Sequence, residues 1–281
     1  MASAPFTELP GAGGAEGGQL AREPRNRART APMARPDSRT LDAPRPVEMT
    51  LGFHRYAEGS VLYRAGSTVV LCTASVDAKV PSFLEGKGKG WLTAEYQMHP
   101  RANPQRREPR DGRGKAPGGR TQEIQRLIGR ALRAAIDLDK LGERTIAIDC
   151  DVLEADGGTR TASVTGGFVA LALALAKIKA PVLRSPVAAI SVGCLAGDEL
   201  ALDLVYLEDS KARVDLNVVA TDAGAIVEVQ GTAEGEPVAR KTMDSMVDLA
   251  LVGIAQLTLL QRQVLARAGV DLRALSAHTP P

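Results

Sequence analysis

The 281-residue sequence is poor in aromatic side chains, cysteine and histidine. One Trp, four Tyr and four Phe are too few for a broad platform on which nucleic-acid bases could stack. Cys72, Cys150 and Cys194 lack CxxC spacing, which argues against a zinc ribbon or a disulfide scaffold and favours reduced, intracellular chemistry. The three histidines are scattered without HxxxH spacing, so we expect no catalytic zinc site.

Long apolar runs and a secretory leader are lacking as well. No segment approaches the ~18–20 uninterrupted apolar residues of a membrane span. The N-terminus shows no basic start followed by an apolar core, so we expect a cytoplasmic protein without membrane contacts. The sequence contains no GxSxG elbow, no dinucleotide fingerprint and no GxxxxGK[ST] loop, which disfavours the enzyme classes that use these motifs.

Net charge is small and unevenly distributed. Residues 1–39 hold six arginines and four acidic residues, so they account for the whole formal charge of +2. Residues 1–34 are rich in Gly, Ala, Pro and Arg without hydrophobic periodicity, and we expect them to be disordered. This extension is either a dispensable tail or an Arg-rich arm that contacts RNA. A single folded domain over 35–269 and a flexible tail over 270–281 complete the expected organisation.

Within this domain, segments whose hydrophobic pattern has the period of a strand alternate with segments that have the period of a helix. The predicted strands begin near Val47 and include 56–63, 67–76, 91–98, 145–153, 187–194, 199–207, 214–221 and 225–230. Three helices are predicted. The first follows an N-capping Thr121, the second runs from 159 to about 179, and the third runs from about 242 to 268. This order predicts an α+β fold with a mixed sheet and helices mainly on one face.

A long loop over 99–119 interrupts the pattern, and loops of this length are usually functional. It carries six basic residues and two acidic ones, and arginines that contact phosphates supply affinity with little sequence readout. We therefore expect this loop to contact a polyanion. Phe83 and Trp91 flank a nearby Gly-Lys-rich loop and are either core residues or stacking residues.

The segment Asp156-Gly157-Gly158-Thr159-Arg160-Thr161 lies where a predicted strand gives way to a helix. Unpaired N–H groups at a helix start, a hydroxyl and a guanidinium together would suit a phosphate. The alternative is a glycine turn with a capping threonine. Arg120 follows Gly118-Gly119 at a second loop-to-helix junction, and two such arginines could clamp one tetrahedral anion, although each taken alone could be a solvated surface charge.

Asp209 and Asp215 are six residues apart, one just past a predicted strand and the other at the start of the next. An intervening turn would bring both carboxylates to the same end of the sheet. Such a pair could hold Mg²⁺ or transfer a proton, and the alternative is a solvated acidic turn. Glu208 could assist, although strand alternation would turn it to the opposite face.

Taken together, the motifs resemble the RNase PH family of phosphate-dependent 3′ exoribonucleases over about residues 35–268. The resemblance rests on segments in one order: 57–62 (AEGSVL), 90–96 (GWLTAEY), 118–128 (GGRTQEIQRLI), 149–163 (DCDVLEADGGTRTAS), 208–210 (EDS), 215–219 (DLNVV) and 228–234 (EVQGTAE).

The resemblance implies a β-α-β-α fold with a left-handed crossover, assembled into a homo-hexamer that is a trimer of dimers. It implies phosphate binding by Arg120, Gly158, Thr159 and Arg160. Asp209 and Asp215 would bind Mg²⁺ or assist proton transfer. Contacts to tRNA would come from Arg101, Arg106 and Arg110, although one extra loop residue leaves Arg107 as a competitor of Arg110.

The implied activity is that of a tRNA nucleotidyltransferase. Inorganic phosphate would be the co-substrate, and nucleoside 5′-diphosphates would be released from the 3′ ends of tRNA precursors and other RNA such as rRNA, reversibly. The main alternative is a non-catalytic RNA-binding subunit of an exosome-like ring. A small-molecule kinase would need an ATP-binding glycine loop that the sequence lacks. A hydrolytic nuclease would have no need for two phosphate clamps.

Overall fold

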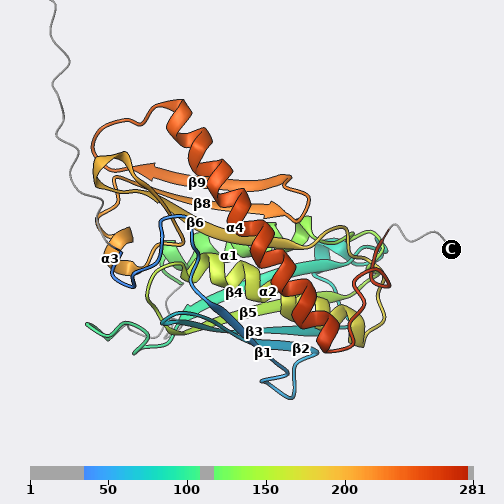
Figure 1. The fold of residues 1–281 in the computed structure, drawn as a ribbon. Helices are drawn as coiled ribbons and strands as arrows, with labels where there is room; N and C mark the ends of the chain where they lie inside the picture. The colour runs from blue at the N-terminus through green and yellow to red at the C-terminus, as the bar shows by residue number, and fades with distance from the viewer. Residues whose placement is uncertain (1–34, 108–116, 278–281) are drawn as a thin grey trace, which may run out of the picture. The chain divides into compact units, whose positions relative to one another are not determined.

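The computed structural model describes residues 35–107 and 117–277, and all elements below lie within these ranges. The first sheet has the strand order β1-β2-β3-β5-β4 (Figure 1). Its strands are β1 (Val47–Leu51), β2 (Gly59–Ala65), β3 (Thr68–Asp77), β4 (Trp91–Met98) and β5 (Thr145–Glu154). Neighbouring strands are antiparallel except β4 and β5, which are parallel because helix α1 (Gly119–Ala134) connects them.

The second sheet is antiparallel throughout and has the strand order β7-β6-β8-β9. Its strands are β6 (Val187–Cys194), β7 (Leu200–Leu202), β8 (Val214–Thr221) and β9 (Ile226–Ala233). The other helices are α2 (Thr159–Lys177), the short α3 (Tyr206–Asp209) and α4 (Arg240–Arg267), and two 3-10 turns cover Ser82–Leu84 and Ala196–Asp198.

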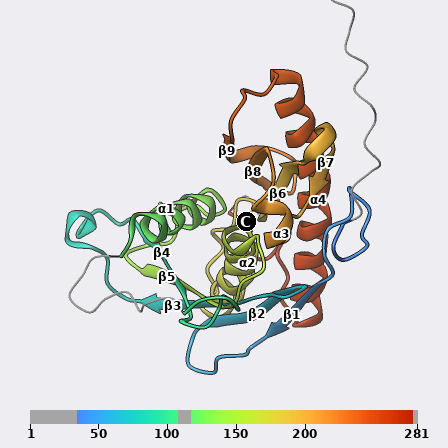
Figure 2. The same cartoon turned by 90° about the vertical axis from the view of Figure 1, so that its left-hand side faces the viewer.

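Sheets and helices alternate as layers, as Figure 2 shows. Helix α2 packs on β2 and β3 of the first sheet and on β6 of the second, while α4 covers the other face of the second sheet. Every residue of β6 is buried. Val187 and Ala189 belong to the core around α2, whereas Ala188 and Ile190 belong to the core beneath α4. The strand is apolar without alternation because both of its faces are covered.

Small residues let α2 lie close to the first sheet. A Cβ on Gly59 of β2 would fall 2.0 Å from the carbonyl oxygen of Ala170, and one on Gly166 would fall 2.9 Å from Cys72 Sγ. Helices α2 and α4 are long and apolar enough to span a membrane by length and composition alone, with 78% and 33% of their most apolar windows buried. The apolar character of α2 follows from its place between two sheets.

The predicted α+β fold with a mixed sheet is confirmed, and β4, β6 and β8 have the predicted bounds. Two local predictions are wrong. The strand predicted over 199–207 ends at Leu202, because Asp203 adopts a left-handed conformation (φ 55°) and α3 follows. Helix α1 begins at Gly119 after an N-terminal Gly118, so Thr121 lies inside its first turn and is not the cap.

The predicted N-terminal extension, residues 1–34, lies outside the described ranges, as do residues 278–281 of the predicted C-terminal tail. Residues 270–277, expected as part of a flexible tail, are held to the domain. The N–H of Leu183 donates to the carbonyl of Leu275 at 2.7 Å, and the N–H of Ala277 donates to the carbonyl of Leu183 at 2.7 Å. Phe83 is 57% exposed and lies edge-on to Trp91, so it is not a core residue.

Candidate active site

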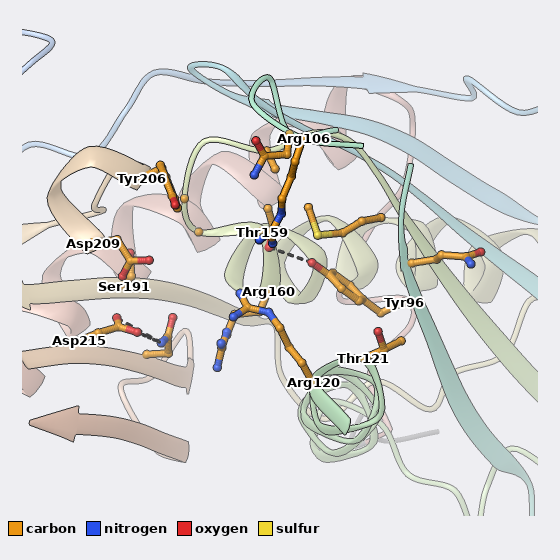
Figure 3. Close-up of a pocket in the computed structure, with 17 residues that line it drawn as sticks. Tyr96, Arg106, Arg120, Thr121, Thr159, Arg160, Ser191, Tyr206, Asp209 and Asp215 are labelled. Atoms are coloured by element: carbon orange, nitrogen blue, oxygen red, sulfur yellow. Dashed lines mark hydrogen bonds between the residues drawn. The ribbon is translucent and has the colours of Figure 1, made fainter. Parts of the chain in front are cut away.

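A cavity of about 420 Å³ opens where the first sheet, α1 and α2 meet the second sheet and α3 (Figure 3). Its lining residues are Tyr96, Gln97, Met98, Asn103, Arg106, Arg120, Thr121, Ala155, Gly157, Gly158, Thr159, Arg160, Ser191, Tyr206, Asp209, Asp215 and Asn217. Residues that are more than 100 positions apart in the sequence therefore share one cavity, as the predicted phosphate clamp and carboxylate pair require.

The strand-to-helix junction after β5 forms one wall of this cavity. Gly157 and Gly158 have φ angles of 78° and 65°, a conformation that strongly favours glycine. Helix α2 begins immediately afterwards, and no side chain caps it. Thr159 does not act as the cap of the alternative interpretation, because its Oγ1 shares a 2.9 Å hydrogen bond with Tyr96 Oη. The uncapped N-terminus of a 19-residue helix therefore faces the cavity with its positive end.

Three arginines approach this wall from different elements. Arg160 lies in the first turn of α2, 3.5 Å from Glu123 Oε1 and 3.4 Å from Gln230 Oε1. In Figure 3 the Arg120 side chain extends from α1 toward Arg160, and Arg106 extends toward Thr159. The convergence of Arg120 and Arg160 on one space beside the helix start makes this space chemically suited to an anion.

The two predicted aspartates lie across the cavity from this wall. Asp209 is the last residue of α3, not a residue at a strand end, and Asp215 lies on β8. Asn217 donates from Nδ2 to the two carboxylate oxygens of Asp215 at 3.3 and 3.4 Å. Glu208 does not assist them, because its carboxylate is buried and accepts hydrogen bonds from Arg35 Nε and Nη2 at 2.7 and 2.8 Å.

The local electrostatics hold the pKa values of both aspartates above their ordinary value. Burial raises the pKa of Asp209, and the charges of Arg160 and Arg120 offset this only in part. Burial also raises the pKa of Asp215, the neighbouring charge of Asp209 raises it further, and Arg160 offsets part of the effect. Two partly buried like charges of this kind favour a cation between them.

No group of three or more His, Cys, Asp or Glu that could hold a metal is present in residues 35–107 and 117–277. The Asp209–Asp215 pair nevertheless fits Mg²⁺, which commonly takes only one or two protein carboxylates and completes its shell with water and substrate phosphate oxygens. The pair provides hard oxygen ligands, and a bound cation would offset the repulsion between the two carboxylates.

The arginine loop contributes only in part to the cavity. Arg106 lines it, whereas Arg101 is exposed outside it with its Nη2 3.5 Å from the carbonyl oxygen of Pro104. Arg107 is exposed, and Arg110 lies outside the described residues. Sequence reasoning missed Tyr96, Ser191 and Asn217, although the inward-facing positions of β4, β6 and β8 could have suggested them.

Comparisons with known proteins agree with this architecture. The family model "3′ exoribonuclease family, domain 1" (RNase PH) matches residues 43–177, and the model of domain 2 of the same family matches residues 185–253. The structure of rice (Oryza sativa) Rrp46 superposes with a TM-score of 0.68 at 18% identity, covering 82% of this chain and all of that one. A chain of the Archaeoglobus fulgidus exosome with RNA bound to the active site superposes with a TM-score of 0.67 at 21% identity, covering 81% of this chain and 92% of that one.

Proposed function

Because the chain belongs to the RNase PH family of 3′ exoribonucleases, we propose that it shortens RNA from the 3′ end by phosphorolysis. Inorganic phosphate is the nucleophile and a nucleoside 5′-diphosphate is the product. The reaction exchanges a phosphodiester for a phosphoanhydride, so it is reversible and added nucleoside diphosphate extends the RNA.

The proposal rests mainly on one observation: an anion-binding wall and a carboxylate pair face each other across one cavity. Phosphorolysis requires two anions to approach each other, the attacking phosphate and the scissile phosphodiester. Hydrolysis requires a binding site only for the scissile phosphodiester. The wall formed by Arg120, Arg160 and the start of α2 supports a dedicated site for the attacking phosphate.

In the proposed reaction a phosphate oxygen forms a bond to the terminal phosphorus of the RNA. The bond from that phosphorus to the 3′ oxygen of the preceding ribose breaks, and this oxygen takes up a proton. Arg120 and Arg160 neutralise and orient the attacking phosphate, and the hydroxyl of Thr159 donates to it. Asp209 and Asp215 would hold Mg²⁺, which when bound offsets negative charge on the scissile phosphate.

The proposed substrates are tRNA precursors and other RNA 3′ ends, processed in the cytoplasm by a homo-hexamer arranged as a trimer of dimers. Arg101, Arg106 and the following loop would contact the RNA backbone, a role suited to arginine because phosphate contacts supply affinity. An Arg106→Ala variant should therefore weaken binding of a 3′-extended tRNA and reduce its dependence on salt. Native mass spectrometry tests the assembly.

A non-catalytic RNA-binding ring subunit is the second candidate, because one superposed structure is a chain of an archaeal exosome, at an identity that supports the fold alone. Such a subunit needs the arginine loop but neither the anion-binding wall nor the carboxylate pair. Retention of Arg120, Arg160, Asp209 and Asp215 around one cavity supports the enzyme.

The test is to incubate the protein, Mg²⁺ and a 3′-extended tRNA with and without millimolar phosphate and to identify the released nucleotides. The proposal predicts nucleoside diphosphates only when phosphate is present, and their loss in Asp215→Asn. Asp248→Asn, which changes an exposed aspartate on α4, should retain activity. Nucleoside monophosphates released regardless of phosphate would show hydrolysis, and RNA binding without release would favour the ring subunit.

A further inference from the structure

A buried ion pair lies directly behind the Gly157–Gly158 loop. Arg45, just before β1, is 4% exposed and donates from Nε to Asp203 Oδ2 at 2.9 Å and from Nη2 to Oδ1 at 2.6 Å. The backbone N–H of Arg45 also donates to Asp203 Oδ2, at 2.8 Å. The carboxylate thus fixes both the position and the plane of the guanidinium.

The same guanidinium binds the glycine loop through its carbonyl groups. Arg45 Nη1 donates to the carbonyl oxygen of Asp156 at 2.8 Å, and Nη2 lies 3.5 Å from that of Gly157. Buried Thr68 completes the arrangement: its hydroxyl donates to the carbonyl oxygen of Gly157 at 2.7 Å and accepts from the N–H of Asp156 at 3.0 Å.

These contacts decide which way the peptide groups face. In a trans peptide the carbonyl and the following N–H point in opposite directions, and the described chain contains no cis peptide. With the carbonyls of Asp156 and Gly157 directed at Arg45 and Thr68, the N–H groups of Gly157 and Gly158 are directed away from them. Within the described ranges neither N–H donates to a protein acceptor, and both glycines line the cavity.

We infer that Arg45 is a positioning residue for the phosphate site: by holding two carbonyls from behind, it presents the N–H groups of Gly157 and Gly158 to the attacking anion. Successive N–H groups in such a turn form an anion-binding concavity. Arg45 touches neither substrate nor the reacting atoms and acts through the loop.

The ion pair also connects the two halves of the active site. Asp203 begins the segment that leads into α3 and Asp209, and this segment touches the glycine loop: a Cβ on Gly157 would fall 2.5 Å from the carbonyl oxygen of Leu204. Asp156 Oδ1 accepts from the N–H of Tyr206, the first residue of α3, at 3.2 Å. Arg45 and Asp203 therefore help set the separation between the phosphate loop and the carboxylate pair.

The Arg45–Asp203 ion pair stays charged over the neutral pH range and can therefore hold the glycine loop in one geometry there. Burial would raise the pKa of Asp203, but the hydrogen bonds and charge of Arg45 outweigh it and hold that pKa below its ordinary value. The carboxylate is then ionised throughout the neutral range, so the loop geometry does not change with pH there.

This inference rests on the proposed function, because it takes the loop as the site of the attacking phosphate. The test compares Arg45→Lys and Thr68→Val with Arg64→Lys, a control arginine on β2 that is exposed and lies 3.5 Å from Glu154. Lysine keeps the charge but cannot reproduce the planar fork, and valine replaces the hydroxyl with a methyl group of similar size. For each variant, inorganic phosphate is titrated by calorimetry, and KM for phosphate, KM for RNA and kcat are measured.

The expected result is an increase in KM and Kd for phosphate of about tenfold in Arg45→Lys and about threefold in Thr68→Val, with KM for RNA within about twofold of wild type. Unchanged phosphate constants in a folded Thr68→Val would overturn the inference, as would equal rises in both KM values. If Arg45→Lys does not fold, Thr68→Val carries the test. Weakened calorimetric phosphate binding in a protein without phosphorolysis would support the positioning role while rejecting the proposed function.

Discussion

Tyr96 on β4 and Thr159 at the start of α2 share a hydrogen bond of 2.9 Å between their hydroxyl oxygens. Burial raises the pKa of Tyr96, although Thr159 and the charges of Arg120 and Arg160 offset part of the effect. Tyr96 therefore remains protonated and can donate to Thr159 Oγ1, which leaves the hydrogen of Thr159 available for an anion. The bond links the first sheet to the proposed phosphate site.

Replacing Tyr96 with Phe should raise KM for phosphate by about fivefold, because Thr159 loses the group that orients its hydroxyl, and one neutral hydrogen bond contributes about 1 kcal/mol. KM for RNA should stay nearly constant. Steady-state kinetics at varied phosphate measure both constants, with Tyr56→Phe as the control at a tyrosine that is 73% exposed. An equal rise in both KM values would contradict the assignment.

Gly157→Ala and Gly52→Ala test the close approach at the active site. Both glycines have positive φ, so both substitutions incur backbone strain of about 1 kcal/mol. At Gly52 a Cβ meets nothing within 4 Å, whereas at Gly157 it would fall 2.5 Å from the carbonyl oxygen of Leu204. We expect Gly157→Ala to cost about 1–3 kcal/mol more in the free energy of unfolding, measured by urea denaturation. Similar costs would show that Leu204 does not constrain the loop.

Asp215→Asn should abolish activity and yet stabilise the protein at neutral pH. The raised pKa of Asp215 means that ionisation of this side chain opposes folding, so its contribution to stability is present at low pH and is lost as the pH rises through the folded-state pKa. The variant should gain on the order of 1 kcal/mol, or about 2–4 °C in Tm.

The raised pKa of Asp215 also predicts how the stability gained in Asp215→Asn depends on pH and on Mg²⁺. The difference in Tm between Asp215→Asn and wild type should shrink as the pH is lowered through the raised folded-state pKa toward the ordinary pKa of an aspartate, because the wild-type carboxylate becomes protonated. Mg²⁺ should raise the Tm of the wild type more than that of the variant, because a bound cation stabilises the folded state. A lower Tm for Asp215→Asn at neutral pH would reject this electrostatic description.

The buried pair of Arg35 and Glu208 should matter far more than a surface pair. Their side chains are 1% and 5% exposed, whereas those of Arg64 and Glu154, which lie 3.5 Å apart, are 44% and 59% exposed. Glu208→Gln leaves a buried guanidinium without its anion and should cost about 3 kcal/mol in the free energy of unfolding. Glu154→Gln should cost at most about 1 kcal/mol. Chemical denaturation of both variants measures the difference.

Elements defined by local patterns could be predicted from the sequence. Trp91–Met98 and Val214–Thr221 combine a clear strand pattern with turn residues at their ends, so their bounds were predictable. The loop that we propose binds phosphate could also be singled out from the sequence, since glycines, a hydroxyl and an arginine adjoin one another at Gly157–Arg160. Asp209 and Asp215 line one cavity, as their expected proximity requires, although the helix that carries Asp209 was not expected.

Features that depend on distant partners could not be read from any local pattern. Arg45 and Asp203 are 158 residues apart, and Arg35 and Glu208 are 173 apart, so no spacing rule connects them. Each looks like an ordinary surface charge until tertiary packing buries it. The division of the strands into two sheets has the same origin. Strand β6 pairs with β8 and not with a strand of the first sheet, and tertiary contacts determine this pairing.

The central claim is that inorganic phosphate is the nucleophile, and isotope transfer tests it most directly. A 3′-extended tRNA is incubated with the protein, Mg²⁺ and radiolabelled inorganic phosphate, and the released nucleotides are separated. Phosphorolysis predicts that each released nucleoside diphosphate carries the label in its β-phosphate, while its α-phosphate comes unlabelled from the RNA. Release of unlabelled nucleoside monophosphates at the same rate with and without phosphate would contradict the account.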